Sequence, residues 1–199
     1  ILNPFIFKKI KSDSRAKVQK LFSKDALKII SVGRLTLQKD FMTMVKAINL
    51  VKKRNVELII LGKGSERDNL QKFINNKNLS NKIKLIGYKK NPFKYINQSE
   101  IFLLTSIFEG SPNVLIEAQY LKKYIISTNC PTGPREILEN GKIGDLIKIG
   151  DHKKLSNILE NFRLNKSTKK KIELGFKNTK QYDYKLNCLS YYNLIKAYL

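Results

Sequence analysis

The stretch IFLLTSIFEGSPNVLIEA, residues 101–118, decides the fold. It opens with an apolar run, and a short continuous run of this kind indicates a strand covered on both faces. Ser111 is a favourable N-cap and Pro112 a favourable first helical residue, so we expect a helix to begin there. A strand, a loop and a helix in this order form the repeating unit of a parallel α/β sheet.

The same unit recurs on both sides of this stretch. Helical spacing is clearest over residues 41–51, where apolar residues follow one another at i, i+3, i+4, i+7 and i+10. We therefore predict a Rossmann-like, doubly wound parallel sheet of about six strands over residues 1–160. The apolar runs that predict its strands lie at 28–33, 56–62, 83–86, 101–105, 124–128 and 145–149.

Residues 161–199 change to one helix after another. The last helix should carry an apolar stripe, which needs a partner surface. Two partners stay open: the sheet of this domain, or a preceding domain absent from the chain. The stripe is formed by Leu189, Tyr192, Ile195 and Leu199.

The composition is that of a globular protein, with 42% hydrophobic residues in a chain of 199. No apolar run approaches the ~20 residues of a membrane span. The start at Ile1 resembles neither an initiating methionine nor a signal peptide, so we expect a piece of a longer chain. Cys130 and Cys188 lie far apart, which favours a reducing, cytoplasmic location.

Net charge is the unusual feature: 39 Lys and Arg against 16 Asp and Glu give +23. Three interpretations stay open. The lysines reflect codon bias, or they hold a peripheral enzyme on the anionic inner face of a membrane, or they bind nucleic acid. We expect no specific nucleic acid, because lysines occur in nearly every segment instead of clustering with arginine and stacking aromatics.

Ligands of an open α/β sheet bind beyond the carboxyl ends of the strands. The loop after the first strand offers Gly33, Arg34 and Lys39, and two cations beside one loop suit a diphosphate. The alternative is a pair of solvated surface charges. The loop that begins at Gly62 resembles a dinucleotide fingerprint but has Arg67 where the third glycine belongs, which argues against hydride transfer.

The loop after the strand at 101–105 is the strongest candidate site. A helix opening at Ser111 would present free N–H groups to an anion, with Glu109 beside them. Glu117 falls on the helical wheel between Tyr120 and Leu121, where a carboxylate is costly unless it is paired. A ribose diol would satisfy it, and so would an internal salt bridge to a lysine.

These residues together resemble the C-terminal, donor-binding domain of glycosyltransferase family 4, a GT-B-type group of retaining enzymes. The likeness covers roughly residues 1–160 in order. It runs through Asn3-Pro4, Gly33-Arg34, Lys39, Gly62 and Gly64, Gly87-Tyr88, the glutamates 109 and 117, and the turn Gly133-Pro134-Arg135-Glu136.

The resemblance implies transfer of a hexosyl or N-acetylhexosaminyl group from a nucleotide sugar, most simply a UDP-sugar, to a glycan or lipid-linked acceptor with retention. It implies no metal and no further cofactor. Catalytic roles would fall to Glu109, Arg34 and Lys39. The residues implied in donor binding are Gly33, Arg34, Lys39, Gly62, Tyr88, Glu109, Gly110, Ser111, Pro112, Asn113, Val114 and Glu117.

The sequence departs from the family pattern in one respect, and alternative functions stay open. The family pattern includes a preceding acceptor-binding domain, which this chain lacks, and the helices of 161–199 would pack on it. The alternatives are another GT-B-type enzyme, such as a nucleotide-sugar epimerase or an inverting transferase, or a non-enzymatic basic module that binds RNA or lipid.

Overall fold

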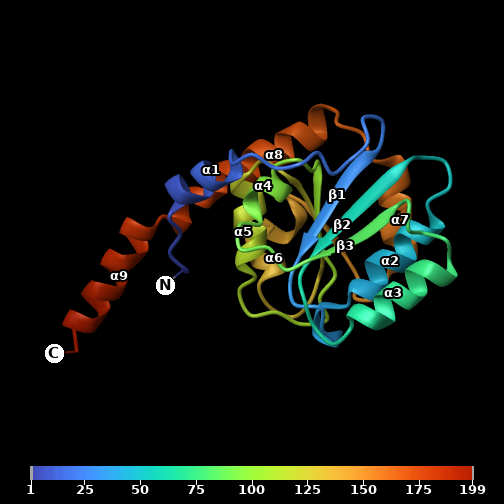
Figure 1. The fold of residues 1–199 in the computed structure, drawn as a ribbon. Helices are drawn as coiled ribbons and strands as arrows, with labels where there is room; N and C mark the ends of the chain where they lie inside the picture. Colours follow the sequence, from blue (N-terminus) through green and yellow to red (C-terminus); the bar gives the residue numbers. More distant parts are fainter. Residues whose placement is uncertain (1, 199) are drawn as a thin grey trace.

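The computed structural model describes residues 2–198, and its framework is one six-stranded sheet (Figure 1). The strands stand in the order β3-β2-β1-β4-β5-β6, and every neighbouring pair is parallel. The prediction of a Rossmann-like, doubly wound sheet is therefore confirmed. The strands are β1 Leu27–Val32, β2 Val56–Leu61, β3 Ile83–Gly87, β4 Ile101–Leu104, β5 Tyr124–Thr128 and β6 Asp145–Ile147.

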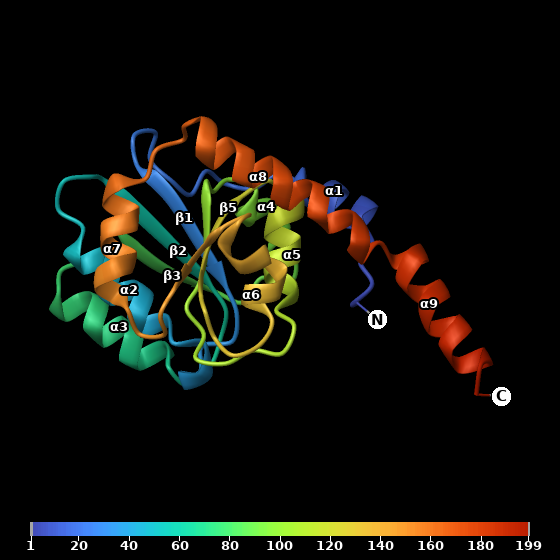
Figure 2. The ribbon, with the colours of Figure 1, turned by 180° about the vertical axis from the view of Figure 1, so that it is seen from behind.

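Helices cover both faces of the sheet (Figures 1 and 2). Neighbouring strand residues such as Ile29 and Ile30 point into different hydrophobic clusters, and both are fully buried. This double burial explains why the strand sequences are continuously apolar. One face carries α2 Phe41–Leu50, α3 Arg67–Asn76 and α7 His152–Asn161, and the other α1 Phe7–Ser14, α4 Phe93–Ile96, α5 Asn113–Tyr120 and α6 Pro134–Ile137.

Short 3₁₀ helices and caps complete the connections. Asp151 caps α7 by accepting a hydrogen bond from the Lys154 N–H at 2.8 Å, and Asn165 caps α8 (Lys166–Asn178) in the same way by accepting from the Thr168 N–H. Both polar residues satisfy a helix N–H that would otherwise lack a partner. The 3₁₀ helices span Leu37–Lys39, Glu139–Gly141 and Thr179–Tyr182.

The first of the C-terminal helices, α8 (Lys166–Asn178), packs on the sheet domain. It contacts α5 and β5. Two ion pairs fasten it, Lys122–Glu173 at 2.8 Å and Lys171–Asp145 at 2.7 Å. This helix therefore belongs to the same folded body as the strands.

The final helix, α9 (Tyr184–Lys196), projects away from the sheet (Figures 1 and 2). Leu189, Tyr192 and Ile195 are 58, 60 and 58% exposed, so this domain's own sheet is not their partner. That alternative was wrong, because the chain turns outward at Asp183. The fourth member of the predicted stripe, Leu199, lies outside the described residues.

The beginning of α9 is held beside the N-terminal segment. The Phe5 N–H donates to the Tyr182 carbonyl at 2.8 Å, and the Tyr184 N–H donates to the Phe5 carbonyl at 3.1 Å. The buried side chain of Asn187 accepts from the Leu2 N–H. Among residues 2–198, no helix combines the length and the apolar character that a bilayer crossing needs.

Candidate functional site

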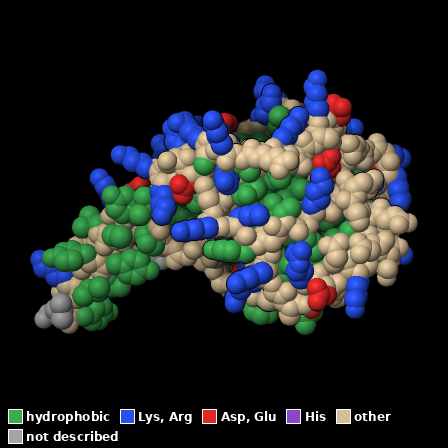
Figure 3. All heavy atoms as spheres, in the orientation of Figure 1, with side chains coloured by type: hydrophobic (Ala, Val, Ile, Leu, Met, Phe, Trp, Pro, Cys, Tyr) green, Lys and Arg blue, Asp and Glu red, His purple; other side chains and the backbone are tan. Residues whose placement is uncertain are grey.

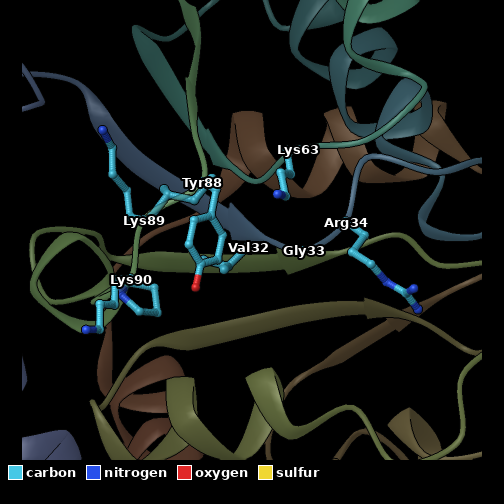
Figure 4. A pocket seen from close by; sticks show the side chains of 9 residues that line it. Val32, Gly33, Arg34, Lys63, Tyr88, Lys89 and Lys90 are labelled. Carbon is cyan, nitrogen blue, oxygen red and sulfur yellow. The ribbon is translucent and has the colours of Figure 1, made fainter.

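A cavity of about 410 Å³ opens where β1, β2 and β3 end (Figure 4). Its floor is apolar, and Tyr88, which is 65% exposed, projects into it. Lys63 points toward the same space, whereas the Arg34 guanidinium lies on the far side and is directed away from Tyr88 (Figure 4). The lining residues are Val32, Gly33, Arg34, Leu61, Lys63, Tyr88, Lys89, Lys90 and Pro92.

The lining carries four cations and no carboxylate. Arg34 was predicted here, but Lys63, Lys89 and Lys90 were missed as site residues. Lys63 follows Gly62 directly and the other two follow Tyr88, so the strand-end rule that found their neighbours could have found them as well. An apolar floor, an exposed aromatic ring and surrounding cations suit a ligand that joins a flat ring to negative charge.

The predicted cation Lys39 stands beside this cavity but is already paired. A β-carbon on Gly33, which lines the cavity, would lie 3.9 Å from Lys39 Cδ. The ammonium group of Lys39 contacts Glu109 Oε1 at 2.6 Å, and Ser106 Oγ donates to the same oxygen at 2.6 Å. These contacts join two loops that are 70 residues apart in the chain. Ser106 had not been identified from the sequence.

The close approach of two loops explains Gly62. A β-carbon at this position would lie only 1.8 Å from the Gly33 carbonyl oxygen, so a side chain has no room. Gly33 itself does not adopt a left-handed conformation. The steric constraint at this point is therefore the close approach of Gly62 to the Gly33 carbonyl oxygen.

The opening of α5 lies one residue later than predicted. Pro112 occupies the N-cap position with extended backbone angles, the helix begins at Asn113, and Ser111 makes no capping hydrogen bond. Extended angles at Pro112 leave Ser111 outside the helix, too far back to reach its first turn. The Asn113 and Val114 N–H groups have no acceptor among residues 2–198, as first-turn donors of a helix commonly do.

The neighbouring loop after β5 supports this opening. Thr132 Oγ1 donates to the Glu109 carbonyl, and Thr128 Oγ1 donates to the Ser106 carbonyl at 2.6 Å. A β-carbon at Gly133, whose φ is +84°, would lie 2.3 Å from the Gly110 carbonyl oxygen. The turn Gly133-Pro134-Arg135-Glu136 is therefore in contact with the loop that carries Glu109.

Glu117 lies one turn into α5, half-buried and outside the cavity lining. It forms no ion pair or hydrogen bond within residues 2–198, so the internal salt bridge proposed as its alternative partner is wrong. Burial without a partner raises the pKa of this carboxyl to about 7. A carboxyl in this state calls for an external hydrogen-bond donor.

The structure thus brings most of the predicted residues to one edge of the sheet. Gly33, Arg34 and Tyr88 line the cavity. Lys39 and Glu109 are joined beside it, and Asn113 accepts a hydrogen bond from Asn3 at 2.7 Å. Within residues 2–198, His, Cys, Asp and Glu side chains form no group of three that could hold a metal ion.

The family model described as "Glycosyl transferases group 1" matches residues 12–178. The chain belongs to this family. The group 1 match extends beyond the sheet into α8, which agrees with the packing of that helix on β5.

Curated relatives of the group 1 domain include glycosyltransferases from an archaeon and a bacterium. The domain is 45% identical to an uncharacterized glycosyltransferase of Methanocaldococcus jannaschii, over 58% of this chain and 29% of that protein. It is 34% identical to the N-acetylgalactosamine-N,N'-diacetylbacillosaminyl-diphospho-undecaprenol 4-alpha-N-acetylgalactosaminyltransferase of Campylobacter jejuni, over 78% of this chain and 44% of that enzyme. The chain thus spans less than half the length of these relatives.

Solved structures share the fold of the group 1 domain. A glycosyltransferase of Rickettsia africae superposes with a TM-score of 0.84 at 19% identity, over 98% of this chain and 55% of that one. Anabaena HepE, in complex with UDP and glucose, superposes with a TM-score of 0.79 at 20% identity, over 86% and 49%. The chain therefore has the Rossmann-like fold found in GT-B glycosyltransferases.

Proposed function

We propose that this chain is the donor-binding half of a retaining glycosyltransferase that uses a nucleotide sugar. The observation that carries the proposal is a cavity at the carboxyl edge of the sheet that Arg34 and Tyr88 line, with the Lys39–Glu109 pair beside it. This edge is where α/β sheets bind their ligands. Family membership and the HepE complex with UDP and glucose support the same assignment.

In this proposal the diphosphate of the donor binds between Arg34 and Lys39. Cleavage of the glycosyl–phosphate bond leaves negative charge on the diphosphate and positive charge on the sugar. Fixed cations next to the leaving group lower the barrier because they bind this charge as it develops. The free N–H groups of Asn113 and Val114 add to the same field.

The remaining parts of the donor follow from the neighbouring groups. The base lies against Tyr88, and the ribose hydroxyls donate to Glu117, which has no other partner within residues 2–198. The transferred sugar contacts Glu109 and the loop from Gly110 to Pro112. We propose uridine as the nucleoside and an N-acetylhexosamine as the sugar, on the model of the Campylobacter relative. We propose no metal.

Retention of configuration is part of the proposal. We expect a front-face reaction that forms no covalent sugar–enzyme intermediate, since the family resemblance implies a reaction of this kind. Inversion of the anomeric carbon by the full-length protein would refute this part, and an epimerised nucleotide sugar would indicate the epimerase alternative.

The acceptor would bind to another half of a longer protein. We assign contact with that half to α9, whose apolar residues Leu189, Tyr192 and Ile195 are exposed. The acceptor would be a glycan or a lipid-linked saccharide, as in the Campylobacter relative, and the protein would be cytoplasmic. The isolated chain should then bind donor and transfer little.

Calorimetric titration of the full-length protein with UDP and a UDP-sugar tests the proposal. Arg34→Ala combined with Lys39→Ala should weaken UDP binding roughly a hundredfold, because two charge-assisted contacts are lost. A matched control is Lys72→Ala with Lys77→Ala, which removes two exposed cations that do not line the cavity. Equal affinities in the two double variants would place the phosphates elsewhere. Binding that is insensitive to the nucleotide but falls with salt would indicate a polyanion-binding module.

A further inference from the structure

Positive charge is unevenly distributed along this chain, contrary to the even spread expected from the sequence. Residues 95–165 hold eight basic and eight acidic side chains, so this third of the protein contributes no net charge. Residues 8–24 and 89–94 hold ten basic side chains and one acidic one, Asp13. A codon bias acting on the whole sequence does not account for this difference.

The two basic segments form one surface, which we call the basic strip. It consists of residues 8–24 and 89–94. The Asn91 side chain donates to the Asp13 carbonyl at 2.9 Å, and Lys94 Nζ donates to the Lys17 carbonyl at 3.4 Å. Its cations are Lys8, Lys9, Lys11, Arg15, Lys17, Lys20, Lys24, Lys89, Lys90 and Lys94.

Charge in the basic strip is not neutralised within the described chain. Residues 2–198 form three ion pairs, and none of them includes a member of the strip. Eight of its ten cations are exposed, the exceptions being Lys89 and Lys94. Figure 3 shows Lys and Arg side chains around an apolar hollow on the face that carries α1 and β3. A concentration of uncompensated charge of one sign attracts an extended anionic partner.

We propose that the basic strip is the surface by which the protein docks on an anionic lipid membrane. Nine of the ten cations are lysines, whose compact charges suit a fluid layer of headgroups and not the bidentate contacts of a nucleic-acid reader. Tyr95, an aromatic ring in this region, has Lys89 and Lys94 over it, with their Nζ atoms 6.0 and 5.5 Å from the ring centroid. This ring is therefore not free to stack on a base.

Exposed apolar residues flank the strip at its α1 end. Ile6 is 55% and Leu2 39% exposed. Cationic side chains next to a few exposed apolar ones are typical of segments that lie on a membrane surface. Lys89 and Lys90 belong both to the strip and to the lining of the 410 Å³ cavity, so docking would place the cavity mouth close to the lipid headgroups.

Vesicle sedimentation of the full-length protein tests this surface. The strip variant carries Lys9→Glu, Lys11→Glu, Lys17→Glu and Lys20→Glu. The matched control carries Lys72→Glu, Lys77→Glu, Lys153→Glu and Lys154→Glu. These change the net charge equally, at exposed sites in α7, in α3 and directly after α3. The partition coefficient onto vesicles with one third phosphatidylglycerol should fall at least a hundredfold for the strip variant and much less for the control.

Three results would overturn the proposal. The first is an equal loss in both variants, which would make binding a matter of net charge only. The second is undiminished binding to vesicles of phosphatidylcholine alone, which would make it apolar. The third is a strip variant that keeps vesicle binding but loses binding to single-stranded RNA. Thermal unfolding and UDP titration of both variants separate these results from misfolding and from failure of the proposed donor site.

Discussion

At the scale of single residues, Glu117 makes stability depend on pH. Its pKa rises from the ordinary 4.5 to about 7 because burial penalises the carboxylate. Ionisation of Glu117 therefore leaves the free energy of unfolding unchanged below about pH 4.5, and it lowers this free energy by the full amount above about pH 7. Glu117→Gln should raise the free energy of unfolding at pH 8 by on the order of 1–3 kcal/mol and leave it unchanged at pH 4.

Urea unfolding at the two pH values measures this effect. Glu136→Gln serves as the control, since Glu136 is exposed and forms no ion pair within residues 2–198. The same carboxyl should make donor binding pH-dependent: if ribose hydroxyls donate to the carboxylate, UDP affinity falls up to tenfold per pH unit below about 7. A flat affinity profile from pH 5.5 to 8.5 would contradict the ribose assignment.

Ser106 should matter for the sugar and not for the nucleotide. Its hydroxyl and Lys39 both hold Glu109 Oε1, and Ser106 is fully buried. Under the proposed function, Ser106→Ala should lower the affinity for a UDP-sugar by about 5- to 30-fold while UDP affinity stays constant, because one hydrogen bond that orients Glu109 is lost.

Ser99→Ala is the matched control for this prediction. Ser99 is also a buried serine, and its hydroxyl donates to the Ile96 carbonyl. It lies just before the start of β4, at the end of the strand opposite to Ser106. A parallel fall in UDP and UDP-sugar affinity for Ser106→Ala would mean a general loss of structure. Unchanged affinities for both UDP and the UDP-sugar would show that Ser106 does not position Glu109.

Some of the site residues could be predicted from the sequence and others could not. Gly33 and Arg34 were predictable because the ends of parallel strands mark the ligand-binding edge of the sheet, and Tyr88 was predicted from the family resemblance. The Lys39–Glu109 contact was not, since it depends on side-chain rotamers across two loops 70 residues apart. Ser106 was missed because a small polar residue in a loop looks the same in sequence whether it holds a carboxylate or faces water.

At the scale of elements, the packing of two loops depends on Gly62. Any β-carbon there meets backbone, at 1.8 Å from the Gly33 carbonyl oxygen, and no side-chain rotation relieves the contact. Gly62→Ala should therefore destabilise the fold by about 2–4 kcal/mol and weaken UDP binding, as the loops after β1 and β2 separate. Chemical unfolding and nucleotide titration measure both effects.

Gly110→Ala is the comparison for stability. A β-carbon at Gly110 meets no atom within 4 Å, and its φ is not positive. Its stability should change by less than ~0.5 kcal/mol, as at other unobstructed surface positions. Equal free energies of unfolding for the Gly62 and Gly110 variants would show that the loop containing Gly33 can move to accommodate a side chain at Gly62.

Strands were more predictable than short helices for a physical reason. Each strand is buried on two faces, so its apolar run is visible without context. The last strand ends at Ile147, two residues earlier than expected, because Gly150 and Asp151 turn the chain into α7. Helices such as α4 span a single turn, which is too short to develop an apolar period.

At the scale of the whole molecule, the proposed function gives α9 the role of contacting a second half of a longer protein. Leu189→Asp with Ile195→Asp places two charges on its exposed apolar surface. In the full-length protein these changes should lower transferase activity at least tenfold and speed proteolysis between the halves, while UDP affinity stays constant. Burial of a single leucine or isoleucine side chain contributes about 1.5–3 kcal/mol, enough for such an effect.

Ser190→Asp with Asn193→Asp adds the same charge to polar positions of α9 and serves as the control. If transferase activity is unchanged in the Leu189→Asp, Ile195→Asp variant as well as in the control, α9 does not contact another part of the protein.

The uneven charge of the basic strip gives the molecule a permanent electric dipole. In the field of an anionic surface a dipole turns before it touches, within the Debye length of about 8 Å at physiological ionic strength. Each collision would therefore be oriented in advance, with the lysines of residues 8–24 facing the anionic surface. Rates of encounter should accordingly fall with salt more steeply than those of a protein with the same total charge spread evenly.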